Sequence, residues 1–362
     1  MMKLQDFDYQ LPQSRIAQSP CAKRDHARMM VLDRRIGSLE HRHFYDFPDF
    51  VRKGDVLVIN DSKVIPARLS GRKETGSRIE LLLLSRYSDS PAVPETDSTE
   101  WPFFRVGVEE TWEALLKPGK RIRIGTSIFF DDHSRATVIE RINEKKWLLT
   151  FNTALPFDLF LQRYGKAPLP PYIKREKKNA QMPEDRDRYQ TIYARSPGSI
   201  AAPTAGFHFS EALFKTLREL EIVIAPVTLH VGFGTFTPIE TEDVEDHVME
   251  VESFSISPES SDKINSAERV IAVGTTSTRV LESAADEQGR VHPMSGQSRL
   301  FIYPGYRFKR VQALLTNFHL PKSSLFLLAC AFAGKDRIQQ AYATAIQEEY
   351  RFYSYGDCML II

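Results

Sequence analysis

The chain has few cysteines, almost no excess charge and no long apolar run, and each of these absences excludes a class of protein. The three cysteines lie far apart, at positions 21, 330 and 358, without the C-x-x-C spacing of a metal site or the even number of a disulfide framework. The longest strongly apolar stretch, residues 325–333, is about half of the roughly 20 residues that span a bilayer. The N-terminal residues 1–10 contain two aspartates and no apolar run, unlike a signal peptide. We therefore expect a soluble, cytoplasmic protein with reduced cysteines and no membrane segment.

The overall charge is unlike that of a general polyanion binder. Lys and Arg total 48 and Asp and Glu total 47, which leaves a formal net charge of +1. Nucleic-acid binding would therefore need local basic patches, with aromatic side chains nearby on which bases could stack. Such clusters occur, although each one taken singly fits a solvated charged surface better. The basic residues that we select as candidates for nucleic-acid binding are Arg68, Lys174, Arg175, Arg307 and Lys309.

The region from Gly54 to Phe151 is predicted to be rich in β-structure. Short segments of β-forming residues are separated there by Gly, Pro and charged turns, which is typical of a barrel-like module. Residues 88–100 interrupt the module with small, acidic and proline residues, as a surface loop or disordered insert would. The predicted strands are residues 56–59, 78–84, 103–108, 121–124, 136–139 and 147–151.

The remainder, residues 1–53 and 152–362, is expected to form the body of the protein. Strands and helices alternate after residue 155, which favours an α/β body with a mixed sheet into which the residues 54–151 are inserted. The predicted helices cover residues 156–164, 211–221, 323–332 and 337–350, and another follows Gly274. The predicted strands cover residues 222–231, 270–273, 300–303 and 311–315.

Five polar or glycine-rich loops could take part in chemistry, and four of them directly follow predicted strands. Ligands of open α/β sheets bind outside the carboxyl ends of the strands, so these positions favour a site. Each loop also has a simpler explanation, as a tight connection, a helix cap or a turn that bonds to its own backbone. Because several such loops lie at the ends of predicted strands, a common site is favoured. The loops are residues 60–62, 196–209, 230–236, 274–279 and 316–321.

The loop at 274–279 lies between a predicted strand and a helix, where free N–H groups and hydroxyls could hold a phosphate or a carboxylate. Arg279 could add a charge-assisted bond. No P-loop lysine follows, and the dinucleotide fingerprint G-x-G-x-x-G is absent there, which argues against nucleotide hydrolysis and NAD binding.

These loops belong to longer segments that follow one another along nearly the whole chain. The segments are DFDYQLP (6–12), IAQSP (16–20), GDVLVINDSKVIPARL (54–69), PLPPYI (168–173), DRYQTIYA (187–194), GSIAAPTAGFHF (198–209), VTLHVGFGTF (227–236), VGTTSTR (273–279), FIYPGYRF (301–308), TNFHLPKSSL (316–325) and YRFYSYGDCMLI (350–361). In this combination and order the chain closely resembles the S-adenosylmethionine:tRNA ribosyltransferase-isomerase family of queuosine biosynthesis.

The resemblance implies a transferase and isomerase that modifies tRNA. Such an enzyme moves the ribosyl part of S-adenosylmethionine onto 7-aminomethyl-7-deazaguanine at the first anticodon position. The ribosyl group rearranges to an epoxycyclopentane, adenine and methionine leave, and the product is epoxyqueuosine in tRNA. The resemblance implies S-adenosylmethionine as co-substrate and no metal or further cofactor. The oligomeric state stays open, a monomer included.

The reaction needs a base that removes a proton beside the sulfonium and an acid that expels adenine. Three histidines lie in the matched loops, and we expect His208, His230 and His319 to supply these functions, with Asp61 as an alternative base.

The same loops provide candidates for binding the donor. We expect Thr275, Thr276 and Arg279 to hold the methionine carboxylate, and one of the nearby phenylalanines at 207, 209, 233 or 318 to face the sulfonium or stack on a base. The other substrate-binding candidates are Thr204, Gly206, Phe207, Gly232, Gly234 and Asn317.

The chain departs from the family pattern at two motifs besides the 88–100 insert. Where His-x-Met-His-x-Glu is usual, this chain has His247-Val-Met-Glu250-Val-Glu252, so only the first histidine and the last glutamate carry over. Before FIYPG it has Ser298 and Arg299, where the family commonly has a Thr and an Asp or Asn.

Two other functions compete with this one. A methyltransferase would use the same donor but leave S-adenosylhomocysteine, and a non-catalytic tRNA-binding protein would not consume the donor at all.

Overall fold

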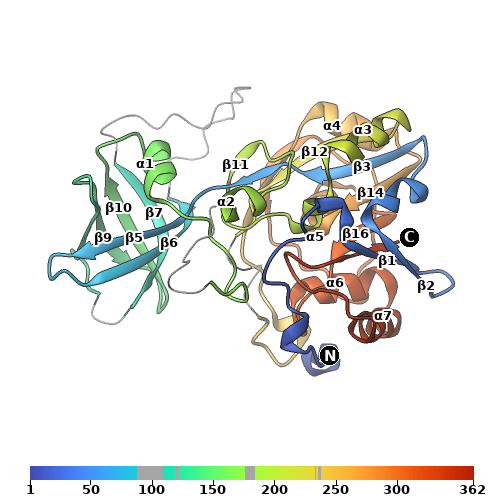
Figure 1. The fold of residues 1–362 in the computed structure, drawn as a ribbon, viewed down its shortest axis with the longest axis horizontal. Helices are drawn as coiled ribbons and strands as arrows, with labels where there is room; N and C mark the ends of the chain where they lie inside the picture. Colours follow the sequence, from blue (N-terminus) through green and yellow to red (C-terminus); the bar gives the residue numbers. More distant parts are fainter. Residues whose placement is uncertain (88–108, 120–121, 176–183, 233, 235–237) are drawn as a thin grey trace.

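The computed structural model describes residues 1–87, 109–119, 122–175, 184–232, 234 and 238–362. These residues form a closed β-barrel at one end of the molecule and a larger α/β body at the other (Figure 1). Strands β4 (Ser62–Val64) and β11 (Ser196–Ser199) pair in parallel as a separate two-stranded sheet.

A nine-stranded mixed sheet forms the body, in the order β15-β13-β12-β3-β14-β16-β17-β1-β2. Four adjacent strands, β12, β3, β14 and β16, run parallel to one another, so their carboxyl ends meet at one edge of the sheet. The strands are β1 (Arg28–Asp33), β2 (Ser38–His43), β3 (Asp55–Asn60), β12 (Val223–Leu229), β13 (Glu252–Ile256), β14 (Arg269–Val273), β15 (Met294–Ser298), β16 (Ala313–Asn317) and β17 (Cys358–Ile361).

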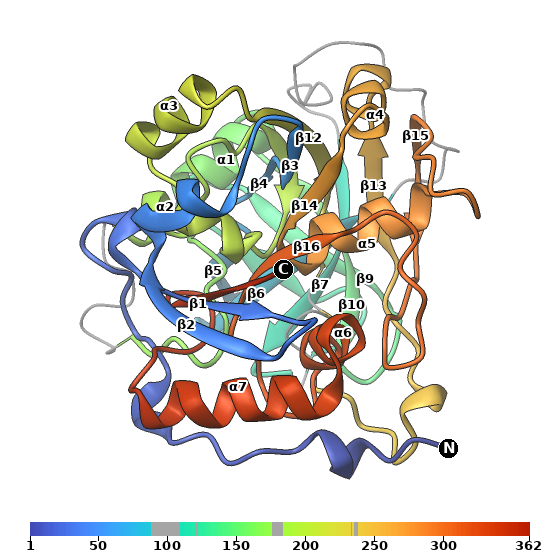
Figure 2. The same cartoon turned by 90° about the vertical axis from the view of Figure 1, so that its right-hand side faces the viewer.

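Helices cover both faces of this sheet, which is why its central strands are apolar throughout. Val58 of β3 packs in the core beneath helices α4 to α7, and its neighbour Leu57 packs in the core beneath α3 and the 3-10 helix η4. Figure 2 shows α3 and α7 on opposite sides of the sheet. The helices are η4 (Phe44–Phe50), α3 (Glu211–Glu219), α4 (Pro258–Asn265), α5 (Gly274–Ala284), α6 (Ser324–Ala333) and α7 (Lys335–Gln347).

The barrel closes in the order β10-β7-β6-β5-β8-β9, and its strands alternate buried and partly exposed residues. Helix α1 (Phe157–Tyr164) follows the last strand and packs its apolar face into the barrel core, where the ring of Phe157 stacks on Trp112. The strands are β5 (Arg68–Lys73), β6 (Arg78–Arg86), β7 (Glu110–Lys117), β8 (Ser127–Phe129), β9 (Arg135–Arg141) and β10 (Lys146–Asn152).

The predicted fold class, a mixed-sheet α/β body with a barrel-like module, is confirmed, but the predicted start of the module is wrong. Strand β3 lies in the sheet of the body, between β12 and β14, and the barrel begins at Arg68. The physical reason is visible in β3 itself, which is buried at all its positions, whereas a barrel strand alternates.

The helices were predicted more accurately than the short strands. Helices α1, α3, α6 and α7 agree with the predictions to within about three residues, and Ser210 caps α3 by accepting a bond from the N–H of Leu213. Residues 300–303 and 122–124 are not strands, and the latter precede β8 instead. The predicted strand 103–108 and the 88–100 insert lie outside the described residues. No helix in the described ranges is long and apolar enough to cross a membrane.

Candidate active site

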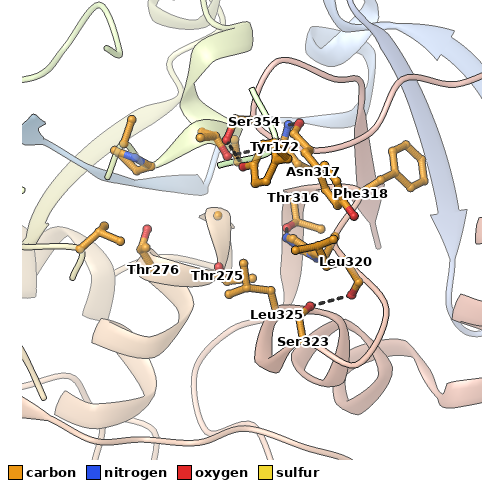
Figure 3. A pocket seen from close by; sticks show the side chains of 18 residues that line it. Tyr172, Thr275, Thr276, Thr316, Asn317, Phe318, Leu320, Ser323, Leu325 and Ser354 are labelled. Carbon is orange, nitrogen blue, oxygen red and sulfur yellow. Dashed lines mark hydrogen bonds between the residues drawn. The ribbon is translucent and has the colours of Figure 1, made fainter. Parts of the chain in front are cut away.

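A pocket opens at the edge where the parallel strands of the body end. It is formed by the N-terminus of α5, the loop after β16, the 3-10 helix η6 (Thr204–His208) and residues near the C-terminus. Figure 3 shows Thr275 and Thr276 on one side and the Thr316–Leu320 segment on the other. Its polar and aromatic lining includes Tyr172, Thr204, Thr275, Thr276, Thr316, Asn317, His319, Ser323, Tyr353 and Ser354.

The N-terminus of α5 forms one side of this pocket. Gly274 starts the helix with a φ of 87°, a left-handed conformation that favours glycine. The helix has no side-chain cap and no acidic residue in its first turn, so its first N–H groups remain available. The hydroxyl of Thr276 is buried and has no hydrogen-bond partner among the described residues. This arrangement suits a carboxylate.

His319 is held in the pocket wall from several directions. Its Nε2 lies 3.1 Å from the hydroxyl of Thr316, and its Nδ1 lies 3.5 Å from the hydroxyl of Tyr342. The hydroxyl of Tyr9 donates to the backbone carbonyl of His319. Burial lowers the pKa of His319 to about 3, so the imidazole is neutral at pH 7.

Asn317 connects the pocket to His208. Its Oδ1 accepts a bond of 3.2 Å from the hydroxyl of Thr204, and its Nδ2 lies 3.4 Å from Nε2 of His208. His208 therefore lies behind Asn317, outside the pocket lining, with its ring against Phe44. Burial, followed by the charges of Arg24 and Arg351, lowers the pKa of His208 to about 3.

His230 and Asp61 directly follow the adjacent strands β12 and β3. The His230 ring lies against Gly198 of β11, where an added Cβ would be 2.8 Å from Nδ1. That Nδ1 is buried without a hydrogen-bond partner in the described ranges, and burial lowers the pKa of His230 to about 4. Asp61 accepts a bond of 2.7 Å from the hydroxyl of Thr228, and burial raises the pKa of its carboxyl group. Neither residue lines the pocket, although Val231 does.

Arg279 lies outside the pocket. Its guanidinium forms a buried ion pair with Glu252, whose other carboxylate oxygen accepts a bond of 3.0 Å from the N–H of Gly232. Burial lowers the pKa of Arg279 to about 10. The chain of bonds joins α5, β13 and the loop after β12, which indicates a structural role for the Arg279 side chain.

The residues at which the chain departs from the family motif form defined contacts in the structure. Glu250 accepts a bond of 2.9 Å from the N–H of Gly234 and forms an ion pair of 2.9 Å with Lys146 of barrel strand β10. Glu250 thereby links the barrel to a loop of the body. His247 packs its ring edge against Phe301, at 5.0 Å between ring centroids.

Among the candidate phenylalanines, Phe318 lines the pocket, whereas Phe207 and Phe209 do not. Two tyrosines, Tyr172 and Tyr353, also line it. Phe207 packs with Tyr189 and Tyr355, Phe209 packs in the core beneath α3, and Phe233 lies outside the described residues. The rings of Tyr172 and Tyr353 are 4.6 Å apart at the pocket. Both belong to the matched segments PLPPYI and YRFYSYG, so the signal for them was present in the sequence.

The remaining candidates are dispersed. Gly206 is buried, and an added Cβ would lie 2.0 Å from the hydroxyl of Tyr193. Among the predicted tRNA-binding residues, Arg175 is paired with Asp185 at 2.7 Å and Lys309 with Glu287 at 3.0 Å. The guanidinium of Arg68 donates to the carbonyl of Leu169, and the side chains of Lys174 and Arg307 are exposed.

Similarity to known proteins distinguishes ribosyl transfer from methyl transfer and from tRNA binding without catalysis. The family model described as queuosine biosynthesis protein matches residues 4–361. The chain belongs to this family. It is 45% identical to the S-adenosylmethionine:tRNA ribosyltransferase-isomerase of Moorella thermoacetica and 48% identical to that of Pelotomaculum thermopropionicum, over 100% of both chains in each case. The crystal structure of an S-adenosylmethionine tRNA ribosyltransferase from Thermotoga maritima is 32% identical, with a TM-score of 0.52, covering 99% of this chain and 100% of that one.

Proposed function

We propose that the chain transfers and isomerises the ribosyl part of S-adenosylmethionine on tRNA, as a step of queuosine biosynthesis. The observation that supports this most strongly is full-length similarity to relatives of that name together with a pocket of suitable chemistry. The acceptor that we propose is 7-aminomethyl-7-deazaguanine at the first anticodon position, and the products are epoxyqueuosine, adenine and methionine. Because its substrate is tRNA, we expect it to act in the cytoplasm.

We place the methionine end of the donor at the N-terminus of α5. The free N–H groups of the first turn and the hydroxyls of Thr275 and Thr276 would bind the carboxylate. Arg279 is not used for this, because its charge is already neutralised by Glu252. The Tyr172 and Tyr353 rings would lie beside the sulfonium, where an aromatic face favours a cation.

His319 is the base that the pocket geometry supports best. As a neutral imidazole it can take the proton from the carbon beside the sulfonium, and the imidazolium that forms can return a proton to the departing adenine. His208 supports the site through Asn317, and His230 and the alternative base Asp61 stay candidates, although neither lines the pocket. The sulfonium is already electrophilic, so we propose that no metal or further cofactor is required. Adenine release should then be unaffected by a chelator.

The test is an incubation of the protein with S-adenosylmethionine and tRNA that carries the aminomethyl precursor. Ribosyl transfer predicts free adenine and methionine, a methyltransferase predicts S-adenosylhomocysteine, and a binding protein predicts neither. The variant His319→Gln should bind tRNA as the wild type does but release little adenine. Normal adenine release from this variant would remove His319 from the mechanism.

A further inference from the structure

Three arginines gather around the N-terminal segment 19–24. Arg24 donates to the carbonyl oxygens of Phe207 and Asp187, at 3.2 Å and 3.3 Å. Arg188 donates to the carbonyls of Cys21 and Ala22, and Arg351 donates to the carbonyl of Ser19. We call Arg24, Arg188 and Arg351 the arginine cluster. Its members share one feature, since each guanidinium is positioned by backbone carbonyls.

The positive charge of the cluster is only partly offset within the described part of the chain, where the carboxylate of Asp357 acts on Arg351 without forming an ion pair. None of the three guanidiniums forms an ion pair there, although carboxylates lie nearby. Those carboxylates have other partners. Asp185 pairs with Arg175, Asp25 accepts a bond from the hydroxyl of Ser210, and Asp357 accepts the backbone N–H groups of Arg28 and Arg351.

Holding these charges together has an energetic cost that a bound anion would remove. Burial and then the charge of Arg188 lower the pKa of Arg24, so the two guanidiniums repel one another. Carbonyl bonds fix the orientation of a guanidinium without cancelling its charge, and they leave other N–H groups free to donate. Guanidinium groups match the geometry of phosphate oxygens especially well.

The cluster is connected to two parts of the pocket lining, because Arg24 bonds to η6, whose Thr204 lines the pocket, and Arg351 lies two residues before the lining residue Tyr353. The Arg24 guanidinium is 5.9 Å from the ring centre of Phe207, and Phe207 belongs to η6, the helix that includes Thr204 and His208. Helix α2 (Asp185–Arg188), which contains Arg188, lies between the barrel and the body (Figure 1). The charges of Arg24 and Arg351 are close enough to act on His208. A nucleotide that enters the pocket would therefore have its neighbouring backbone near these guanidiniums.

We propose that the arginine cluster binds phosphate groups of the tRNA backbone that flank the nucleotide being modified. This inference rests on the proposed function, because it assumes that the anionic partner is tRNA. It also gives the near-neutral chain a local site for a polyanion, which the ion-paired Arg175 and Lys309 do not provide.

The test is the salt dependence of tRNA binding by the single variants Arg24→Gln, Arg188→Gln and Arg351→Gln. Glutamine keeps a donor for the carbonyls but removes the charge. Each variant should bind tRNA several-fold more weakly at low salt, and the slope of log K against log salt should fall by about 0.7 to 0.9 for each phosphate that the variant no longer neutralises. The matched control is Arg34→Gln, since Arg34 is likewise held by two carbonyls, those of Phe332 and Gln312, but lies at the other end of β1. Wild-type affinity and slope in all three cluster variants would overturn the inference.

A second measurement uses the wild-type protein and therefore does not require that the variants fold. Phenylglyoxal modifies accessible arginines, and mass spectrometry of the wild-type protein would report modification at each position with and without tRNA. tRNA should protect the arginine cluster and leave Arg34 unchanged. Equal modification of the cluster in both states would contradict the inference. If adenine is released while the cluster stays unprotected, this inference fails alone; if the cluster is protected but no adenine forms, the proposed function fails alone.

Discussion

His208, His230 and His319 differ from ordinary surface histidines because burial lowers their pKa values to about 3, 4 and 3. At neutral pH they are ready to accept a proton, and none of them starts as an acid. Sequence reasoning identified these residues from their loops but could not assign their protonation, because burial depends on packing between segments far apart in the chain. In the same way, the sequence predicted that Arg279 lies in the pocket. It could not reveal that the side chain pairs instead with Glu252, because Glu252 lies on another strand.

The depressed histidine pKa values predict a pH dependence of stability. Between the folded pKa values and the ordinary value of 6.5, the unfolded chain binds more protons, so the free energy of unfolding rises with pH across this window and falls as the pH is lowered from 6.5. Each histidine contributes at most about 1.4 kcal/mol per pH unit. Urea unfolding at several pH values from 4.5 to 7 should show a smaller slope for His319→Gln than for the wild type. The exposed His26, changed to Gln, serves as control, and equal slopes in all three proteins would contradict the prediction.

At the scale of elements, local signals predicted helices better than strand partners. Ser210 and Gly165 mark helix ends through local bonds, so α3 and α1 were found from the sequence. Strand β1 pairs with β17, more than 300 residues away, and such pairing leaves no local trace. Strand β3 was assigned to the wrong sheet for the same reason, although the apolar residues at both of its faces were visible.

The buried pair between Arg279 of α5 and Glu252 of β13 predicts a large effect on stability. Arg279→Met should lower the free energy of unfolding by about 3–5 kcal/mol, because it leaves a buried carboxylate without its cation. The double variant Arg279→Met with Glu252→Gln should recover much of that loss. Urea unfolding measures both, and a single variant as stable as the wild type would show that the pair is not formed.

The contact between β5 and β8 in the barrel leaves no room for a side chain at Gly71. An added Cβ would lie 2.5 Å from Cγ2 of Ile128 and 2.8 Å from the carbonyl oxygen of Phe129. Gly71→Ala should therefore cost about 1–3 kcal/mol of stability. Gly296 of strand β15, whose added Cβ would meet nothing closer than 3.6 Å, provides the control. Thermal unfolding that is equal for both variants would contradict this packing.

At the scale of the whole molecule, the structure combines a barrel, a mixed-sheet body and a pocket at the carboxyl ends of the central strands. The ion pair between Lys146 and Glu250 links the barrel to the body, although partly exposed pairs of this kind contribute less than about 1 kcal/mol. The net charge of +1 means that affinity for tRNA must come from local groups, of which the arginine cluster is the proposed example. The family and the reaction were predictable because the matched segments run along the whole chain.

The central claim is that the ribosyl group of the donor, and not its methyl group, reaches tRNA. Two preparations of S-adenosylmethionine, one labelled in the ribosyl carbons and one in the methyl group, can be incubated separately with the protein and precursor tRNA. The account predicts that the ribosyl label is recovered in the modified nucleoside while the methyl label leaves with methionine. Recovery of the methyl label in tRNA, with the ribosyl label in S-adenosylhomocysteine, would contradict it.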